Sequence, residues 1–239
     1  MLSSIFTVLA ILLVGVPLAI LVLLRLAPRP ILNWADGRAY RALDVEAFNE
    51  ASPYNAPGFK PVHTELRDLP LEVTGEIPAD LEGVFLRNGT NPQFEKLRGR
   101  YHMFNGAGML HQVQIQGGKA SYSNTYVRTP RYKIEDATGE EVYLGFGDIA
   151  GGGKAAFARM MIDSLKQKRG VVPALDVLES GSSTTAIQYH HNKLYCLQET
   201  GYPFALDTRV ENGKLVLDGN GNWDTFGGKL DSPFTAHPK

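Results

Sequence analysis

The chain has 239 residues, 44% of them hydrophobic, and it carries 24 basic and 25 acidic residues. A formal net charge of −1 excludes electrostatic capture of nucleic acid as its main role, because binding to phosphates needs a surplus of lysine and arginine. The single cysteine, Cys196, excludes an intramolecular disulfide framework and a cysteine-rich zinc site.

The N-terminus is apolar. No charged side chain occurs before Arg25, and residues 5–24 are all apolar or small, about the length that a helix needs to cross ~30 Å of hydrocarbon. Residues 1–27 are therefore predicted to form a transmembrane anchor. A cleaved signal peptide is the alternative, and the missing basic n-region counts against it. Arginines follow the span and no basic side chain precedes it, which predicts a single-pass protein with its bulk on the cytoplasmic side.

Residues 28–64 are polar and interrupted by prolines, which predicts a linker that lies as a strap over the following domain. From Leu71 onward, short runs rich in Val, Tyr, Phe and Thr alternate with Gly, Asn and Pro, as in closely spaced strands. One strand is expected to end at Asn88-Gly89. Two hairpins are expected, with connections at residues 190–193 and 212–213. The pattern predicts an all-β sandwich, barrel or propeller.

One segment, residues 154–169, has helical periodicity. Phe157, Met161 and Leu165 lie four apart, with Met160 and Ile162 beside them, and Gly170 is suited to end the helix. Two interpretations are open: a surface helix whose apolar stripe packs on the core, or a helix lying in a membrane interface with its basic residues on the headgroups. The pattern alone favours the first.

The remaining candidate side chains are expected to have structural roles rather than catalytic or metal-binding ones. His190 and His191 are adjacent in a hairpin and face opposite ways on an extended chain, so they are expected to be exposed turn residues rather than a ligand pair. Cys196 lies in an alternating strand and is expected to be a small buried hydrophobe rather than a nucleophile.

Three motif clusters, in this order and spacing, carry a family resemblance. The first spans residues 75–92, the second residues 101–111 with 120–129, and the third residues 194–199 with Pro203, running on to residues 228–239. From about Glu65 to the last residue they resemble the carotenoid cleavage oxygenases, a family that includes carotenoid and apocarotenoid oxygenases and the vertebrate retinoid isomerohydrolase.

The resemblance implies a seven-bladed β-propeller with Fe(II) on its axis, held by four histidines, three of them steadied by glutamates. It makes His237 the first iron ligand and Glu199 the first of those glutamates, which in the family bonds a later histidine ligand. His102 and His111 fall at positions without an iron role. The family's membrane-penetrating segment occupies the place of residues 154–169, so the resemblance favours docking through Phe157, Met160, Met161, Ile162 and Leu165.

The implied activity is cleavage of a carotenoid or apocarotenoid double bond with O₂ to give aldehyde or ketone products, at a membrane that holds the substrate. Residues 65–239 are expected to form about the first three blades. With one iron ligand of four, the chain is interpreted as an N-terminal part that is inactive alone. A membrane-anchored module that binds a polyene or a partner without catalysis, and a retinoid isomerohydrolase activity, stay open as alternatives.

Overall fold

A computed structural model describes residues 5, 8–9, 11–55, 59–95, 97–150 and 152–238. The chain forms two compact units. The helical unit comprises residues 1–45 and 148–174, and the sheet unit comprises residues 46–147 and 175–239. The division differs from the composition-based boundaries at 27 and 64, because residues 148–174 return from the β-rich part of the sequence to the N-terminal helices.

In the helical unit a π-helical turn, Ile11–Gly15, continues into α2 (Val16–Leu26). Helix α2 ends at Ala27, whose φ of −143° and ψ of 68° lie outside the α region, because a residue before proline is driven out of that region. No single helix within the described residues is long and apolar enough to cross a membrane. One pair, Ile11–Leu26 with Pro28–Ala42, passes the test together but is bent by 117°. Residues 1–4, 6, 7 and 10 of the predicted anchor lie outside the described residues.

Much of the predicted linker is helical. Helix α3 (Pro28–Ala42) starts with proline in its first turn, and α4 (Val45–Ala51) follows it at the boundary between the units. The prolines of this stretch predicted a non-helical linker. Proline at the first helical position loses no hydrogen bond, however, because the first amide groups of a helix have no partner within it.

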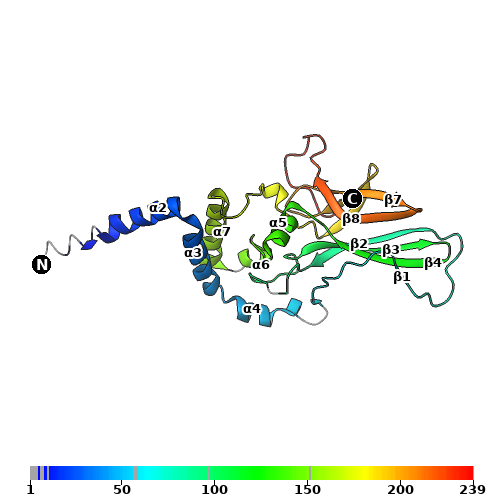
Figure 1. The fold of residues 1–239 in the computed structure, drawn as a ribbon, viewed down its shortest axis with the longest axis horizontal. Helices are drawn as coiled ribbons and strands as arrows, with labels where there is room; N and C mark the ends of the chain where they lie inside the picture. Colours follow the sequence, from blue (N-terminus) through cyan, green and yellow to red (C-terminus); the bar gives the residue numbers. More distant parts are fainter. Residues whose placement is uncertain are drawn as a thin grey trace. The chain divides into compact units, whose positions relative to one another are not determined.

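The sheet unit contains two four-stranded antiparallel sheets (Figure 1). The first has the order β1-β4-β3-β2, from β1 (Leu69–Pro70), β2 (Gly83–Asn91), β3 (Ala107–Gln116) and β4 (Lys119–Tyr126). The second has the order β5-β6-β7-β8, from β5 (Ala186–His190), β6 (Lys193–Leu197), β7 (Phe204–Glu211) and β8 (Lys214–Trp223). The predicted antiparallel strands are thus present in this unit, whereas the other unit is helical.

The turns correct two details of the strand prediction. The β5–β6 connection has two residues, not four, because His190 already pairs with Lys193 and only His191 and Asn192 turn, both with positive φ. The predicted break at Asn88-Gly89 is wrong, since β2 continues through both residues to Asn91. The Asn88 side chain donates to the carbonyls of Ser183 and Ala186 instead of forming a turn. The predicted turn at Asn212-Gly213 is confirmed.

The core of the sheet unit takes side chains from both sheets. Leu110 and Val127 meet residues of the second sheet, which are Cys196, Phe204, Leu206 and Leu217. Cys196 is fully buried, as predicted, and burial raises the pKa of its thiol, which keeps it protonated. Gln112 also links the sheets, because its Nε2 donates to the Leu215 carbonyl at 2.7 Å.

Two short helices interrupt the strand pattern. Helix α5 (Pro130–Thr138) starts at Thr129, whose hydroxyl accepts from the Tyr132 amide, and ends at Gly139, whose φ is 77°. Helix α6 (Phe146–Ile149) lies at the second boundary between the units. Neither is long enough for its periodicity to stand out from the surrounding strands.

Candidate metal centre

His237 and Glu199 lie together in the sheet unit. Glu199 comes two residues after the end of β6, and His237 lies in the segment that follows β8. The Nδ1 of His237 is 3.1 Å from Oε1 of Glu199. The two side chains are 73% and 59% exposed. The resemblance paired this glutamate with a later histidine, whereas here it contacts His237 itself.

The segment that carries His237 is held by short-range and long-range contacts. Ala236 is fully buried, the Phe234 amide donates to the Gly201 carbonyl at 3.0 Å, and the His237 amide donates to the Thr235 hydroxyl at 3.1 Å. The Gly201 contact ties the segment to the loop after β6, where Glu199 lies. These backbone contacts bring together two residues 38 positions apart in the chain.

This pair has the chemistry of one metal ligand with its supporting carboxylate. A histidine that donates from Nδ1 to a carboxylate keeps its Nε2 lone pair for a metal, and the carboxylate orients the ring. A neutral imidazole is a suitable ligand for Fe(II). The described residues supply one ligand and not a complete site, since no group of three or more of their His, Cys, Asp or Glu side chains could hold a metal ion.

A buried polar cluster holds Gln198, the residue that precedes Glu199. The preceding Gln198 is 6% exposed and its Oε1 accepts from the amide of Ser183, which is fully buried. Asn88 in turn donates to the Ser183 carbonyl at 2.7 Å. A Cβ at Gly181 would lie 1.4 Å from Nε2 of Gln198, so any larger residue there would displace the Gln198 amide. The motif spacing did not predict this cluster, because its members come from three separate segments.

The other histidines lie elsewhere. His190 and His191 are exposed at the β5–β6 turn, as predicted. His102 packs against the rings of Phe104 and Phe146. His111 bonds the Tyr122 hydroxyl through Nδ1 at 2.6 Å, and burial, followed by the nearby Arg87 charge, lowers its pKa. These contacts agree with the structural roles predicted for His102 and His111.

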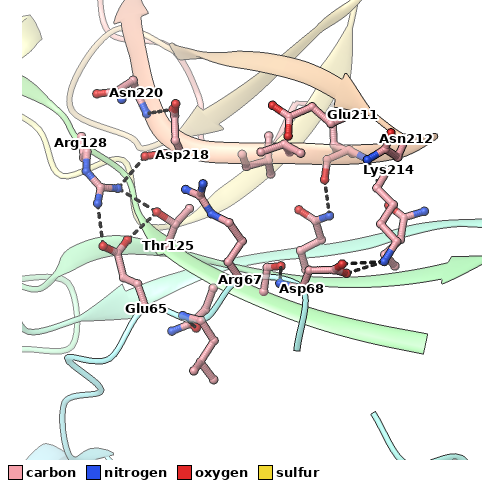
Figure 2. Close-up of a pocket in the computed structure, with 18 residues that line it drawn as sticks. Glu65, Arg67, Asp68, Thr125, Arg128, Glu211, Asn212, Lys214, Asp218 and Asn220 are labelled. Atoms are coloured by element: carbon pink, nitrogen blue, oxygen red, sulfur yellow. Dashed lines mark hydrogen bonds and ion pairs between the residues drawn. The ribbon is translucent and has the colours of Figure 1, made fainter. Parts of the chain in front are cut away.

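A cavity of about 620 Å³ in the sheet unit is separate from the His237–Glu199 pair and lies between the two sheets. Figure 2 shows that ion pairs line it. Arg128 binds Glu65 Oε2 and the Asp218 carbonyl, both at 2.6 Å, and Lys214 binds Asp68 at 2.6 Å. Because Arg128 and Lys214 each join segments of different sheets, we interpret the polar lining as structural.

Glu65 makes the stability of this region pH-dependent. Burial acts to raise its pKa, but hydrogen bonds from Thr125, Arg128 and the Tyr126 amide outweigh burial and hold the pKa below 4.5. A lowered folded-state pKa contributes stability above about pH 4.5 that is lost as the pH falls through the folded value. In Glu65→Gln we expect lower stability at pH 7 and a smaller loss between about pH 5 and pH 3 than in the parent. Thermal unfolding across this pH range measures the stability, with exposed Glu76→Gln as control. Parallel plots of melting temperature against pH for the parent and Glu65→Gln would contradict the assignment.

Helix α7 (Gly153–Lys168) matches the predicted helix to within one residue at each end. Gly170, with φ of 64°, ends it as predicted, and its amide donates to the Gln167 carbonyl. Phe157, Met160 and Met161 are exposed, whereas Ile162 and Leu165 are half-buried. The buried positions are instead Ala156, Arg159 and Lys166. The core-facing interpretation therefore fails for the three exposed residues, since Arg159 and Lys166 are turned inward and Phe157, Met160 and Met161 are left outside.

Comparison with known proteins decides the family. The family described as retinal pigment epithelial membrane protein matches residues 59–239. The chain belongs to this family, the carotenoid cleavage oxygenases. It is 36% identical over 225 residues to carotenoid 9,10(9',10')-cleavage dioxygenase 1 of Arabidopsis thaliana, and 38% identical over 174 residues to that of Phaseolus vulgaris. These alignments cover 89% and 72% of this chain, but 39% and 30% of the relatives.

Solved structures of oxygenases resemble the chain as well. The lignostilbene dioxygenase of Pseudomonas brassicacearum matches with a TM-score of 0.58 and 26% identity, over 79% of this chain and 34% of that one. The cobalt-substituted Synechocystis apocarotenoid oxygenase matches with a TM-score of 0.52 and 27% identity, over 76% and 34%. The chain spans about 39% of the length of its Arabidopsis relative.

Proposed function

We propose that the protein containing this chain is a non-haem Fe(II) dioxygenase that cleaves a double bond of a carotenoid or apocarotenoid. The observation that carries the proposal is the His237–Glu199 pair, at 3.1 Å, in a chain whose matched relatives are carotenoid cleavage dioxygenases. The relative described as cobalt-substituted supports a divalent metal in such proteins. In this proposal the two antiparallel sheets are blades of a seven-bladed propeller.

The described residues have defined tasks in this reaction. Glu199 accepts the Nδ1 proton of His237, fixes the tautomer, and orients Nε2 toward the metal. Bound Fe(II) would supply O₂ activation, and the overall reaction adds both oxygen atoms across one C=C bond to give two carbonyl groups. The exposed apolar residues of α7 would dock the protein on the lipid that holds the polyene, with its bulk on the cytoplasmic side.

The function is tested in a full-length protein that contains this chain. His237→Ala should abolish iron retention and turnover together, and Glu199→Gln should weaken iron binding on the order of 10–100-fold. Iron per protein and product formation are measured, with exposed His191→Ala as the matched control. Unchanged iron content and turnover in His237→Ala reject the assignment.

Product analysis separates the alternatives. Two carbonyl products that take up ¹⁸O from ¹⁸O₂ support the dioxygenase. An isomerised alcohol formed from a retinyl ester indicates isomerohydrolase activity. Retention of a polyene without iron or any product indicates a binding module.

A further inference from the structure

The helical unit has a charge unlike that of the rest of the chain. Residues 1–45 and 148–174 contain nine lysine or arginine residues and four aspartates, a net charge of +5 in a chain whose net charge is −1. The same unit carries the apolar helix α2, whose large hydrophobic side chains are exposed. Its surface therefore combines apolar and basic side chains.

The excess positive charge lies on the surface, because the buried charges of this unit balance one another. Asp36 on α3 binds Lys166 at 2.6 Å and Arg159 at 3.3 Å, and Arg159 also binds Asp148. These four residues are at most 6% exposed and sum to zero charge. The seven other basic residues of the unit are all exposed: Arg25, Arg29, Arg38, Arg41, Lys154, Lys168 and Arg169. Only Asp44 and Asp163 remain to oppose them.

Four of the exposed basic residues converge where α2, α3 and α7 meet. The Arg29 guanidinium donates to the Val171 carbonyl at 3.3 Å, and that of Arg169 donates to the Leu24 carbonyl at 3.5 Å. These two bonds place the C-terminal end of α7 at the α2–α3 bend. Arg25 follows Leu24 in the sequence, and Lys168 precedes Arg169. In the described part of the chain, none of the four forms an ion pair with a carboxylate. We call this set the basic junction.

We propose that the basic junction binds the headgroups of anionic phospholipids. The proposal rests on the membrane docking proposed above and adds a lipid preference to it. Apolar side chains of α2 and α7 suit the acyl region, while guanidinium and ammonium groups beside them suit phosphate at the headgroup level. A surface of net charge +5 favours anionic over zwitterionic lipid, since each basic residue near an anionic leaflet adds to the attraction.

Trp34 makes the lipid preference measurable. It lies on α3 and is 63% exposed, so lipids beside the helical unit can reach its ring. The complete chain is reconstituted in bilayers that mix phosphatidylcholine and phosphatidylglycerol, with bromine on the chains of one lipid at a time. Bromine quenches tryptophan on contact, so the two series give the relative binding of the lipids near Trp34. The fluorescence of Trp223, in the sheet unit, is a constant background.

We expect phosphatidylglycerol to be favoured about 10-fold at low salt, and the preference to fall as added salt screens the charges. The variant Arg25→Gln/Arg29→Gln/Lys168→Gln/Arg169→Gln should bring the ratio close to one. A matched control removes four exposed lysines of the sheet unit, Lys60, Lys119, Lys133 and Lys229, and should keep the preference.

Each outcome has a separate meaning. A ratio near one in the parent chain, or an unchanged ratio in the junction variant, overturns the lipid preference and leaves docking intact. Absence of quenching by either brominated lipid overturns the docking itself. Loss of the preference in the junction variant alone supports the site.

Discussion

Replacing Asp36 with asparagine is expected to destabilise the packing of α3 on α7 by about 3–5 kcal/mol. The change leaves Lys166, which is 3% exposed, without its carboxylate, and leaves Arg159 with Asp148 as its carboxylate partner. A buried charge that loses its partner keeps the cost of desolvation without the compensating attraction. Amide hydrogen exchange of α3 and α7 measures the effect, because local opening exposes these amides.

Asp44→Asn is the matched control for this prediction. Asp44 is exposed just after α3 and has a φ of 49°, a conformation that asparagine also adopts readily. Amide hydrogen exchange of α3 and α7 in Asp44→Asn should equal that of the parent. The double variant Asp36→Asn/Lys166→Met should recover part of the loss, since it removes the stranded ammonium group. Equal protection of α3 and α7 in Asp36→Asn and Asp44→Asn would contradict the role given to the buried ion pairs.

Replacing Phe204 with alanine is expected to destabilise the sheet unit by about 3–5 kcal/mol, because it leaves a cavity in the core shared by the two sheets. Phe204 is fully buried, and its ring meets the Trp223 ring edge-on with centroids 5.0 Å apart. Leu110 of β3 and Val127, the residue after β4, belong to the same cluster. Denaturant unfolding followed by tryptophan fluorescence, together with hydrogen exchange of β6 and β7, measures the change.

Phe85→Ala serves as the control for Phe204. Phe85 lies on β2 and is 61% exposed, so its removal should change stability by no more than about 0.5 kcal/mol. If both alanine variants unfold at the same denaturant concentration, the core does not depend on Phe204.

Local patterns predicted what depends on neighbouring residues. The helix at 154–169 follows from apolar periodicity and a terminal glycine, and the Asn212-Gly213 turn follows from two residues that tolerate positive φ. The same reasoning failed at Asn88-Gly89, where contacts with Ser183 and Ala186 hold the strand extended. A partner 95 residues away leaves no mark in a local pattern.

The candidate site likewise has features that the sequence motifs predicted and features that depend on contacts between distant segments. The motifs singled out His237 and Glu199, but not their direct contact, which depends on the packing of the segment after β8 against the loop after β6. The supporting cluster of Gln198, Ser183 and Asn88 was not predicted either, since each residue is unremarkable in its own segment.

The sequence by itself determined the family, the antiparallel strands, the extent of α7 and the two residues proposed for the metal centre, because motifs and periodicity are written in order along the chain. Only the tertiary structure decided which face of α7 points outward. Its apolar stripe could have packed on a core, but Asp36 on α3 draws Arg159 and Lys166 inward, and Phe157, Met160 and Met161 are left exposed. That outcome depends on a carboxylate 123 residues before Arg159, and no local pattern contains it.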